Sequence, residues 1–80
     1  MNQYATEIME YYQQYKPAKF AAMTEEDFAL MGEQAQAAIE AEMLQIAGPD
    51  REQEDYMEKA ARLTQAKSQA TRRVMRAILA

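Results

Sequence analysis

The sequence predicts an all-α protein: a compact three-helix bundle with a short extra helical turn and a long antiparallel C-terminal hairpin. Apolar residues recur at helical spacing along three long stretches, and strong helix-stop signals separate these stretches. Sixteen alanines among 80 residues allow helices to approach closely. A chain of this length forms one helical domain, residues 1–80, near the lower size limit for a self-sufficient core.

The first predicted helix spans residues 2–16 and ends before Pro17, which disfavours a helical conformation in the residue that precedes it. A short turn over 17–23 follows, with Phe20 and Met23 placed to plug one end of the bundle. One face of the first helix is rich in tyrosine, whose apolar ring and polar tip suit both half-buried seams and protein interfaces. This face is therefore either part of the core or a partner-binding surface, and its candidate residues are Tyr4, Tyr11, Tyr12 and Tyr15.

The central helix is predicted over residues 24–47. Thr24 fits an N-cap with Asp27 in a capping-box position, and the acidic first turn complements the helix dipole. Gly48 followed by Pro49 is a strong stop. The helix carries two apolar stripes on nearly opposite sides, so we expect it to be covered from two directions. One stripe contains Phe28, Met31, Ala35, Ala38, Ile39, Met43 and Ile46, and the other contains Leu30, Ala37, Ala41 and Leu44.

The last helix is predicted over residues 51–79, with Asp50 as its N-cap and Gln53 at the third helical position. A two-residue connection at 49–50 forces an antiparallel hairpin. The predicted apolar stripe runs through Tyr56, Ala60, Leu63, Ala70, Val74 and Ile78, with Ala66 at its edge.

Two charged residues lie on these apolar stripes. Glu42 projects into the first stripe of the central helix, where we expect it to accept a hydrogen bond from a tyrosine. Lys67 lies on the stripe of the last helix, and we expect its ammonium group to reach solvent.

The last helix is expected to be about six residues longer than the central one, or about 9 Å at helical rise. Its overhang would expose Met75, Ile78 and Leu79 in a monomer. This overhang predicts a homodimer in which it meets the tyrosine face of a second copy.

Composition argues against several classes of function. The chain has no Cys and no His, so thiolate chemistry, the commonest metal ligand and the commonest proton shuttle are missing. We expect no catalytic residue, no cofactor, no metal site and no small-molecule substrate. No apolar run reaches the roughly 20 residues of a membrane span and no signal-peptide pattern opens the chain, so we expect a cytoplasmic protein without membrane contact.

The net charge of −4 hides a segregation of charge along the chain. All thirteen acidic residues lie at or before Glu58, and six of the nine basic residues follow it. Such asymmetry marks either a binding surface or an antiparallel bundle whose acidic and basic parts neutralise each other.

Two charged groups are candidate binding sites. The acidic one can mimic phosphate spacing on a protein partner, or simply be solvated; its members are Glu25, Glu26, Asp27, Glu33 and Glu40. The basic one can contact nucleic acid or an acidic partner, or complement the dipole of the last helix; its members are Arg72, Arg73 and Arg76. Other basic residues are expected in i,i+4 pairs, Asp55 with Lys59 and Glu58 with Arg62.

Three stretches, QQYKPAKFAAM, GEQAQAAIEAEM and DYMEKAARLTQAKSQATRRVMRAIL, together carry a resemblance to a known family. Their order and spacing resemble small helical proteins of bacterial transposons and integrated phages, of the TnpV type. The matching features are Pro17, the Glu33–Met43 helix, Tyr56, Arg62-Leu63 and Ala70. The sequence departs from the pattern at Arg72-Arg73, which replace the usual acidic pair.

The resemblance implies an origin in a mobile element and supplies no reaction. We therefore expect a non-enzymatic protein–protein interaction module from a phage or mobile element that docks on a host or element-encoded protein. Its most specific form is an inhibitor of a nucleic-acid-processing defence complex, similar to an anti-CRISPR protein. The alternative is a nucleic-acid-binding accessory protein that uses the basic last helix.

Overall fold

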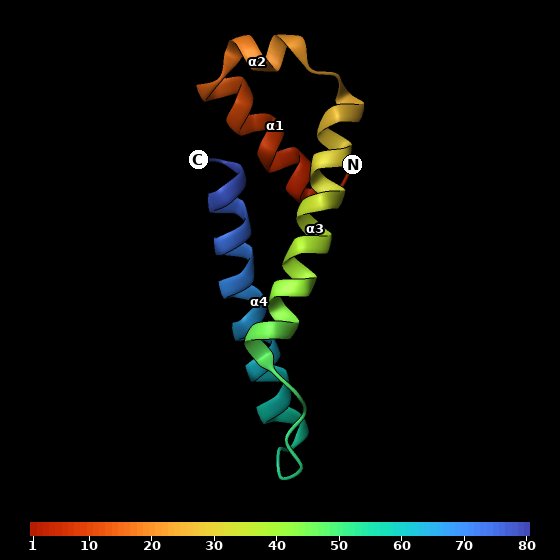
Figure 1. The fold of residues 1–80 in the computed structure, drawn as a ribbon, viewed down its shortest axis with the longest axis vertical. Helices are drawn as coiled ribbons and strands as arrows, with labels where there is room; N and C mark the ends of the chain where they lie inside the picture. Colours follow the sequence, from red (N-terminus) through yellow and green to blue (C-terminus); the bar gives the residue numbers. More distant parts are fainter.

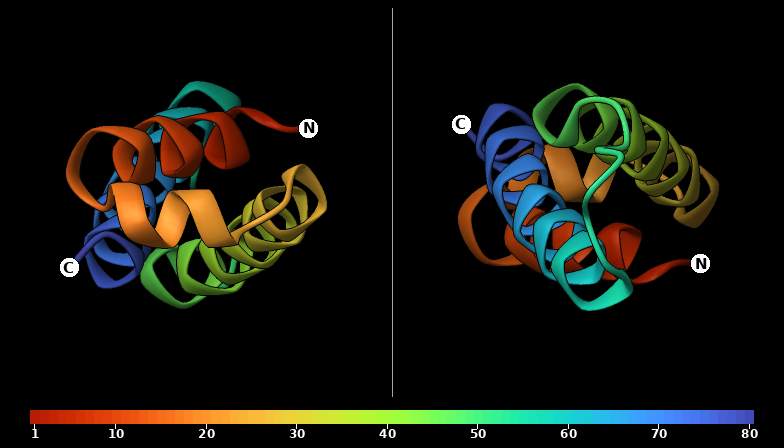
Figure 2. Two further views of the ribbon diagram at one scale, coloured as in Figure 1. Left: turned by 90° about the horizontal axis from the view of Figure 1, so that it is seen from above. Right: turned by 90° about the horizontal axis from the view of Figure 1, so that it is seen from below.

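Four helices and no strands make up the computed structural model, which describes all 80 residues and confirms the all-α prediction. The helices are α1 (Gln3–Tyr15), α2 (Pro17–Ala22), α3 (Glu25–Ala47) and α4 (Tyr56–Ile78). The long helices α3 and α4 form an antiparallel hairpin, α1 packs against its upper half, and α2 crosses the top (Figure 1). The result is a rod of 52 × 19 × 17 Å, and a view along it shows α1, α3 and α4 around a common centre (Figure 2).

The ends of α3 follow the sequence signals. The Asp27 N–H donates to Thr24 Oγ1 at 3.2 Å, and the Thr24 N–H donates to Asp27 Oδ2 at 2.8 Å, so the predicted capping box is confirmed. At the other end Gly48 has a φ of 70°, a conformation that L side chains rarely adopt, and its N–H donates to the Leu44 carbonyl. These local interactions fix the two ends of α3.

The start of α4 differs from the prediction. The helix begins at Tyr56 rather than Arg51, and its N-cap is Asp55, whose Oδ1 accepts a hydrogen bond from the Glu58 N–H at 2.8 Å. The connection therefore spans residues 48–55, and the predicted two-residue turn with an Asp50 cap is wrong.

Ion pairing explains the late start, because Arg62 ties the connection to both long helices. Its guanidinium makes two hydrogen bonds to the Glu54 carboxylate, of 2.7 and 2.8 Å, and a third to the Ala47 carbonyl at the end of α3. Asp50 Oδ2 lies 2.9 Å from Lys59 Nζ, and Asp50 Oδ1 lies 3.6 Å from Arg62 Nη2. The ion pairs expected from i,i+4 spacing are thus replaced by pairs with the connection.

Because α4 starts late, α3 and α4 have the same length of 23 residues. The expected overhang does not exist: Met75 is buried, and Ile78 and Leu79 pack, partly buried, against the core. The homodimer stays a prediction, but the difference in length between the last two helices, on which that prediction was based, is absent.

The core lies where α1 meets the hairpin. Ile8, Phe28 and Ile39 are its largest fully buried side chains, and the Phe28 ring contacts Tyr12 edge-on with centroids 5.7 Å apart. The ring centroids of Phe20 in α2 and Phe28 lie 5.8 Å apart, so α2 closes one end of the bundle as expected.

The N-terminal end of α1 comes very close to α3 at Gly32, a residue that the sequence pattern did not single out. The Asn2 side chain caps α1 through the Ala5 N–H and donates from Nδ2 to the Gly32 carbonyl at 3.0 Å. A Cβ atom at position 32 would lie 2.5 Å from Ala5 Cβ and 2.5 Å from Asn2 Oδ1. Only glycine therefore permits this contact without a shift of α1.

The two apolar stripes of α3 differ in burial. Phe28, Ala35 and Ile39 of the first stripe are buried, whereas Leu30 and Leu44 of the second are 55% and 64% exposed. The expectation that α3 is covered from two directions is wrong, because both α1 and α4 pack on its first stripe. Tyr56 of the predicted α4 stripe is also exposed, since it lies at the end of the rod away from α1 (Figure 1).

Candidate partner-binding surface

The side of α3 that faces away from the core exposes two large apolar residues, Leu30 and Leu44. We call it the outer face and define it as Leu30, Gln34, Ala37, Ala41 and Leu44, all of which are exposed. The residues follow a spacing of four, three, four and three, which is the seam spacing of a coiled coil. The two leucines are fourteen residues apart, or about 21 Å at helical rise. The two alanines between them have much shorter side chains.

Negative charge runs along one edge of the outer face. Glu26, Glu33 and Glu40 are exposed and lie seven residues apart, so they fall on one line beside the leucines. The opposite edge is uncharged, with Met31, Ala38 and Gln45. No Lys or Arg occurs anywhere in α3.

The other two acidic candidates lie at the N-terminus of α3. Asp27 is engaged in the capping box, and Glu25 is exposed in the first turn. Of the five acidic residues predicted to bind a partner, three thus share one edge of the outer face and two serve the helix end.

An apolar groove continues the uncharged edge of the outer face. It is a hollow of about 360 Å³ between α3 and the C-terminal half of α4. Its apolar lining consists of Met31, Ala35, Ala38, Val74, Ala77 and Ile78. Gln34 of the outer face also lines this groove, so the groove and the outer face adjoin.

The tyrosine face of α1 divides between core and surface. Tyr4 and Tyr12 are buried, so they are not available to a partner. Tyr11 is half-buried and packs on the exposed Tyr15 with ring centroids 5.0 Å apart, while Lys16 Nζ lies over the Tyr11 and Tyr12 rings. Tyr15 is thus the one exposed tyrosine of this face, and Tyr11 is exposed in part.

The basic end of α4 is partly neutralised. Arg73 donates to Glu42 of α3 at 3.0 Å, so the expectation that Glu42 accepts from a tyrosine is wrong. Arg72 and Arg76 make no ion pair within 4 Å. All three arginines and Gln69 line a shallow hollow of about 170 Å³.

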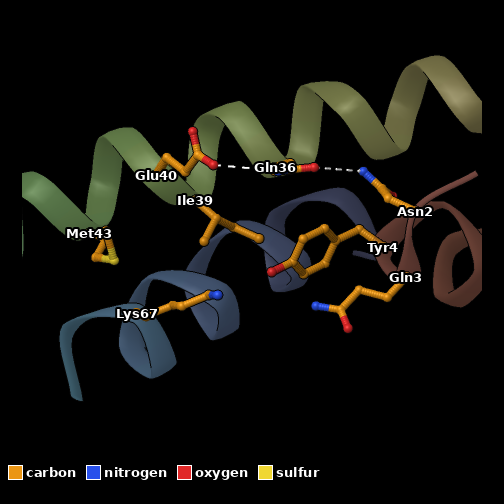
Figure 3. Close-up of a pocket in the computed structure, with 8 residues that line it drawn as sticks. All are labelled: Asn2, Gln3, Tyr4, Gln36, Ile39, Glu40, Met43 and Lys67. Carbon is orange, nitrogen blue, oxygen red and sulfur yellow. Dashed lines mark hydrogen bonds between the residues drawn. The ribbon is translucent and has the colours of Figure 1, made fainter. Parts of the chain in front are cut away.

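A larger polar hollow of about 420 Å³ lies where the start of α1 meets α3 and α4 (Figure 3). Lys67 is exposed at its rim, as expected for a side chain that reaches solvent, and makes no ion pair within 4 Å. On the opposite wall Asn2 donates to Gln36 at 3.1 Å, and Gln36 donates to Glu40 at 3.4 Å. The hollow can hold polar groups, but it has no paired nucleophile and base.

The ionisable groups with shifted pKa values lie in the connection between α3 and α4 or contact it from α4. The hydrogen bonds from Arg62 lower the pKa of Glu54 and in turn raise the pKa of Arg62. The hydrogen bond from Lys59 and its positive charge lower the pKa of Asp50. These shifts reflect ion pairs that hold the connection in place.

No three His, Cys, Asp or Glu side chains converge closely enough to hold a metal ion. None of the helices combines the length and the apolar character needed to cross a membrane.

Comparison with models of known protein families, with curated proteins and with solved structures finds no significant match. The candidate site is therefore defined by the residues and geometry of this chain alone.

Proposed function

We propose that the chain is a non-enzymatic protein–protein interaction module that docks on its partner through the outer face of α3. The observation that carries this proposal is the exposure of Leu30 and Leu44 on a helix whose other side fills the core. Single exposed leucines are common. Here Leu30, Ala37, Ala41 and Leu44 share one exposed face at seam spacing beside an apolar groove, and apolar residues grouped in this way are typical of an interaction surface.

In its narrower form, the proposal is a phage or mobile-element protein that inhibits a nucleic-acid-processing defence complex in the host cytoplasm. Two features support it: the resemblance to TnpV-type proteins, and the line of Glu26, Glu33 and Glu40. Regularly spaced carboxylates suit a basic nucleic-acid groove of another protein, where complementary charge speeds association and favours the correct partner.

A pull-down from a bacterial host lysate tests the proposal when two matched variants accompany the wild type. Leu30→Glu/Leu44→Glu places two charges in the outer face, and Tyr56→Glu/Met57→Glu places the same charges at residues that are 83% and 75% exposed elsewhere. We expect a protein that the wild type and the Tyr56/Met57 variant capture and the Leu30/Leu44 variant does not. Equal capture by all three, or recovery of nucleic acid alone, would contradict the proposal.

The second candidate is a nucleic-acid-binding accessory protein, favoured by the unpaired Arg72 and Arg76 on one hollowed surface of α4. It predicts a gel shift at low salt whose affinity falls steeply as salt is added. Arg72→Gln/Arg76→Gln should abolish this shift, and the Leu30→Glu/Leu44→Glu variant should retain it. If the wild type gives no shift at low salt, this candidate is excluded.

A further inference from the structure

The shape of the outer face indicates what can cover it. Two leucine side chains lie at its ends, and Ala37 and Ala41, whose side chains are short, lie between them. In helix pairs with seam spacing, each large side chain of one helix inserts between four residues of the other. A complementary helix would therefore place large apolar residues over the two alanines and smaller ones against the two leucines.

The charge of α3 argues against a second copy of α3 as the occupant. The helix carries six acidic residues and no basic one. In an antiparallel pair around a two-fold axis, each edge of a seam meets the same edge of the partner, so Glu33 and Glu40 would face carboxylates. A parallel pair would set the acidic edge against Met31, Ala38 and Gln45, which offer no positive charge. Neither arrangement neutralises the edge.

The basic residues of a second copy do not supply the missing partner either. Arg72 and Arg76 lie on a polar surface of α4 with Gln69, whereas the apolar residues Ala66, Ala70 and Met75 of that helix are buried. A partner for the outer face must present apolar and basic residues on the same side. In α4, which carries the unpaired arginines, the larger apolar residues near them, Val74 and Ile78, pack partly buried against the core.

We infer that the occupant is a basic amphipathic helix of another protein. It would span about 21 Å, or roughly four turns, with apolar residues at seam spacing and Lys or Arg along the edge that meets Glu33 and Glu40. This inference rests on the proposed function and specifies the partner. Docking of an amphipathic helix on an apolar surface is a common mode of recognition, and charges at the rim choose the partner.

Three synthetic peptides of three heptads test the inference with the full-length chain. The basic peptide has Leu at the two seam positions of its central heptad, Ala at the seam positions of the outer heptads, Lys at the two flanking positions of every heptad and Gln elsewhere. The acidic peptide has Glu in place of Lys, and the scrambled peptide has the composition of the basic one without a continuous apolar face. Each peptide carries a fluorescent label and is held at nanomolar concentration, where it stays monomeric, while the protein is titrated and anisotropy is read.

We expect the basic peptide to bind about tenfold or more tightly than the acidic and scrambled peptides. Leu30→Glu/Leu44→Glu should weaken its binding at least about tenfold, even though the variant makes the protein more acidic. Tyr56→Glu/Met57→Glu, with the same added charge, should retain it. Glu33→Lys/Glu40→Lys should reverse the preference in favour of the acidic peptide. Circular dichroism checks that each variant keeps its helices.

The inference is overturned if the basic peptide does not bind, if the scrambled peptide binds as tightly, or if the Leu30/Leu44 variant binds unchanged. These outcomes differ from failure of the proposed function. A lysate protein captured only when the outer face is intact would uphold docking through this face, and failure of the basic peptide would then exclude the basic helix alone.

Discussion

Replacement of Gly32 by alanine should destabilise the protein, although alanine normally favours a helix. Alanine in place of a mid-helix glycine contributes about 1 kcal/mol of helix propensity. Against this, the added Cβ would lie 2.5 Å from both Ala5 Cβ and Asn2 Oδ1, so α1 must shift. Overpacking of this kind costs about 1–3 kcal/mol, and disturbance of the Asn2 cap adds about 0.5–2 kcal/mol.

The net expectation is a loss of roughly 2 kcal/mol from the free energy of unfolding, which lowers the Tm of a domain of this size by about 8–16 °C. Thermal unfolding followed by circular dichroism measures this change. Ala37→Gly, at an exposed position of the same helix, calibrates the propensity effect alone and should cost about 1 kcal/mol. A Gly32→Ala variant that melts at or above the wild-type temperature would refute the close contact between α1 and α3.

Three further predictions concern caps, pH and mass. Thr24→Ala removes one hydrogen bond of the capping box and should lower the free energy of unfolding by about 1 kcal/mol in a denaturant titration, whereas Thr24→Ser should change it little. The pKa of Glu54 lies below its usual 4.5 and that of Asp50 below its usual 3.8, so in acid the folded chain binds fewer protons than the unfolded chain. The two ion pairs therefore stabilise the fold fully above these usual pKa values, and this stabilisation is lost as the pH falls through the lowered pKa values of the folded chain. Melting curves between pH 6 and pH 2 should therefore show a steeper acid loss for the wild type than for Glu54→Gln; identical slopes would mean that the Arg62 pair does not form. Sedimentation at micromolar concentration should give 9.2 kDa, because the apolar overhang that predicted a homodimer is packed against the core, whereas a mass of twice this value would support the homodimer expected from sequence.

Local signals predicted the elements whose ends depend on neighbouring residues alone. Thr24 with Asp27, Gly48 and Pro17 each act within a few residues, and the structure places helix ends at all of them. The start of α4 depends on more distant partners. Asp50 with Gln53 and Asp55 with Glu58 both fit an N-cap pattern, and the contacts of Arg62 with Glu54 and Ala47 decide between them.

The candidate site was predictable only in part for a related reason. The sequence marked Glu26, Glu33 and Glu40 as candidates and grouped Leu30 with Leu44, but helical spacing cannot say whether a stripe is covered by the same chain. The same limit applies to α1, where spacing grouped four tyrosines and packing buried Tyr4 and Tyr12. The importance of Gly32 could not be read from sequence, since it depends on where Ala5 lies in space.

Site-specific photo-crosslinking in bacterial host cells tests most directly whether the outer face of α3 binds a foreign protein. A photoreactive amino acid replaces Ala37 or Ala41 at the centre of this face and, as a control, the exposed Met57 in the first turn of α4. We predict that positions 37 and 41 yield the same adduct, larger than two copies of the 9.2 kDa chain, and that position 57 does not yield it. An adduct at position 57 of equal strength, or adducts at 37 and 41 that contain only a second copy of this chain, would contradict the assignment.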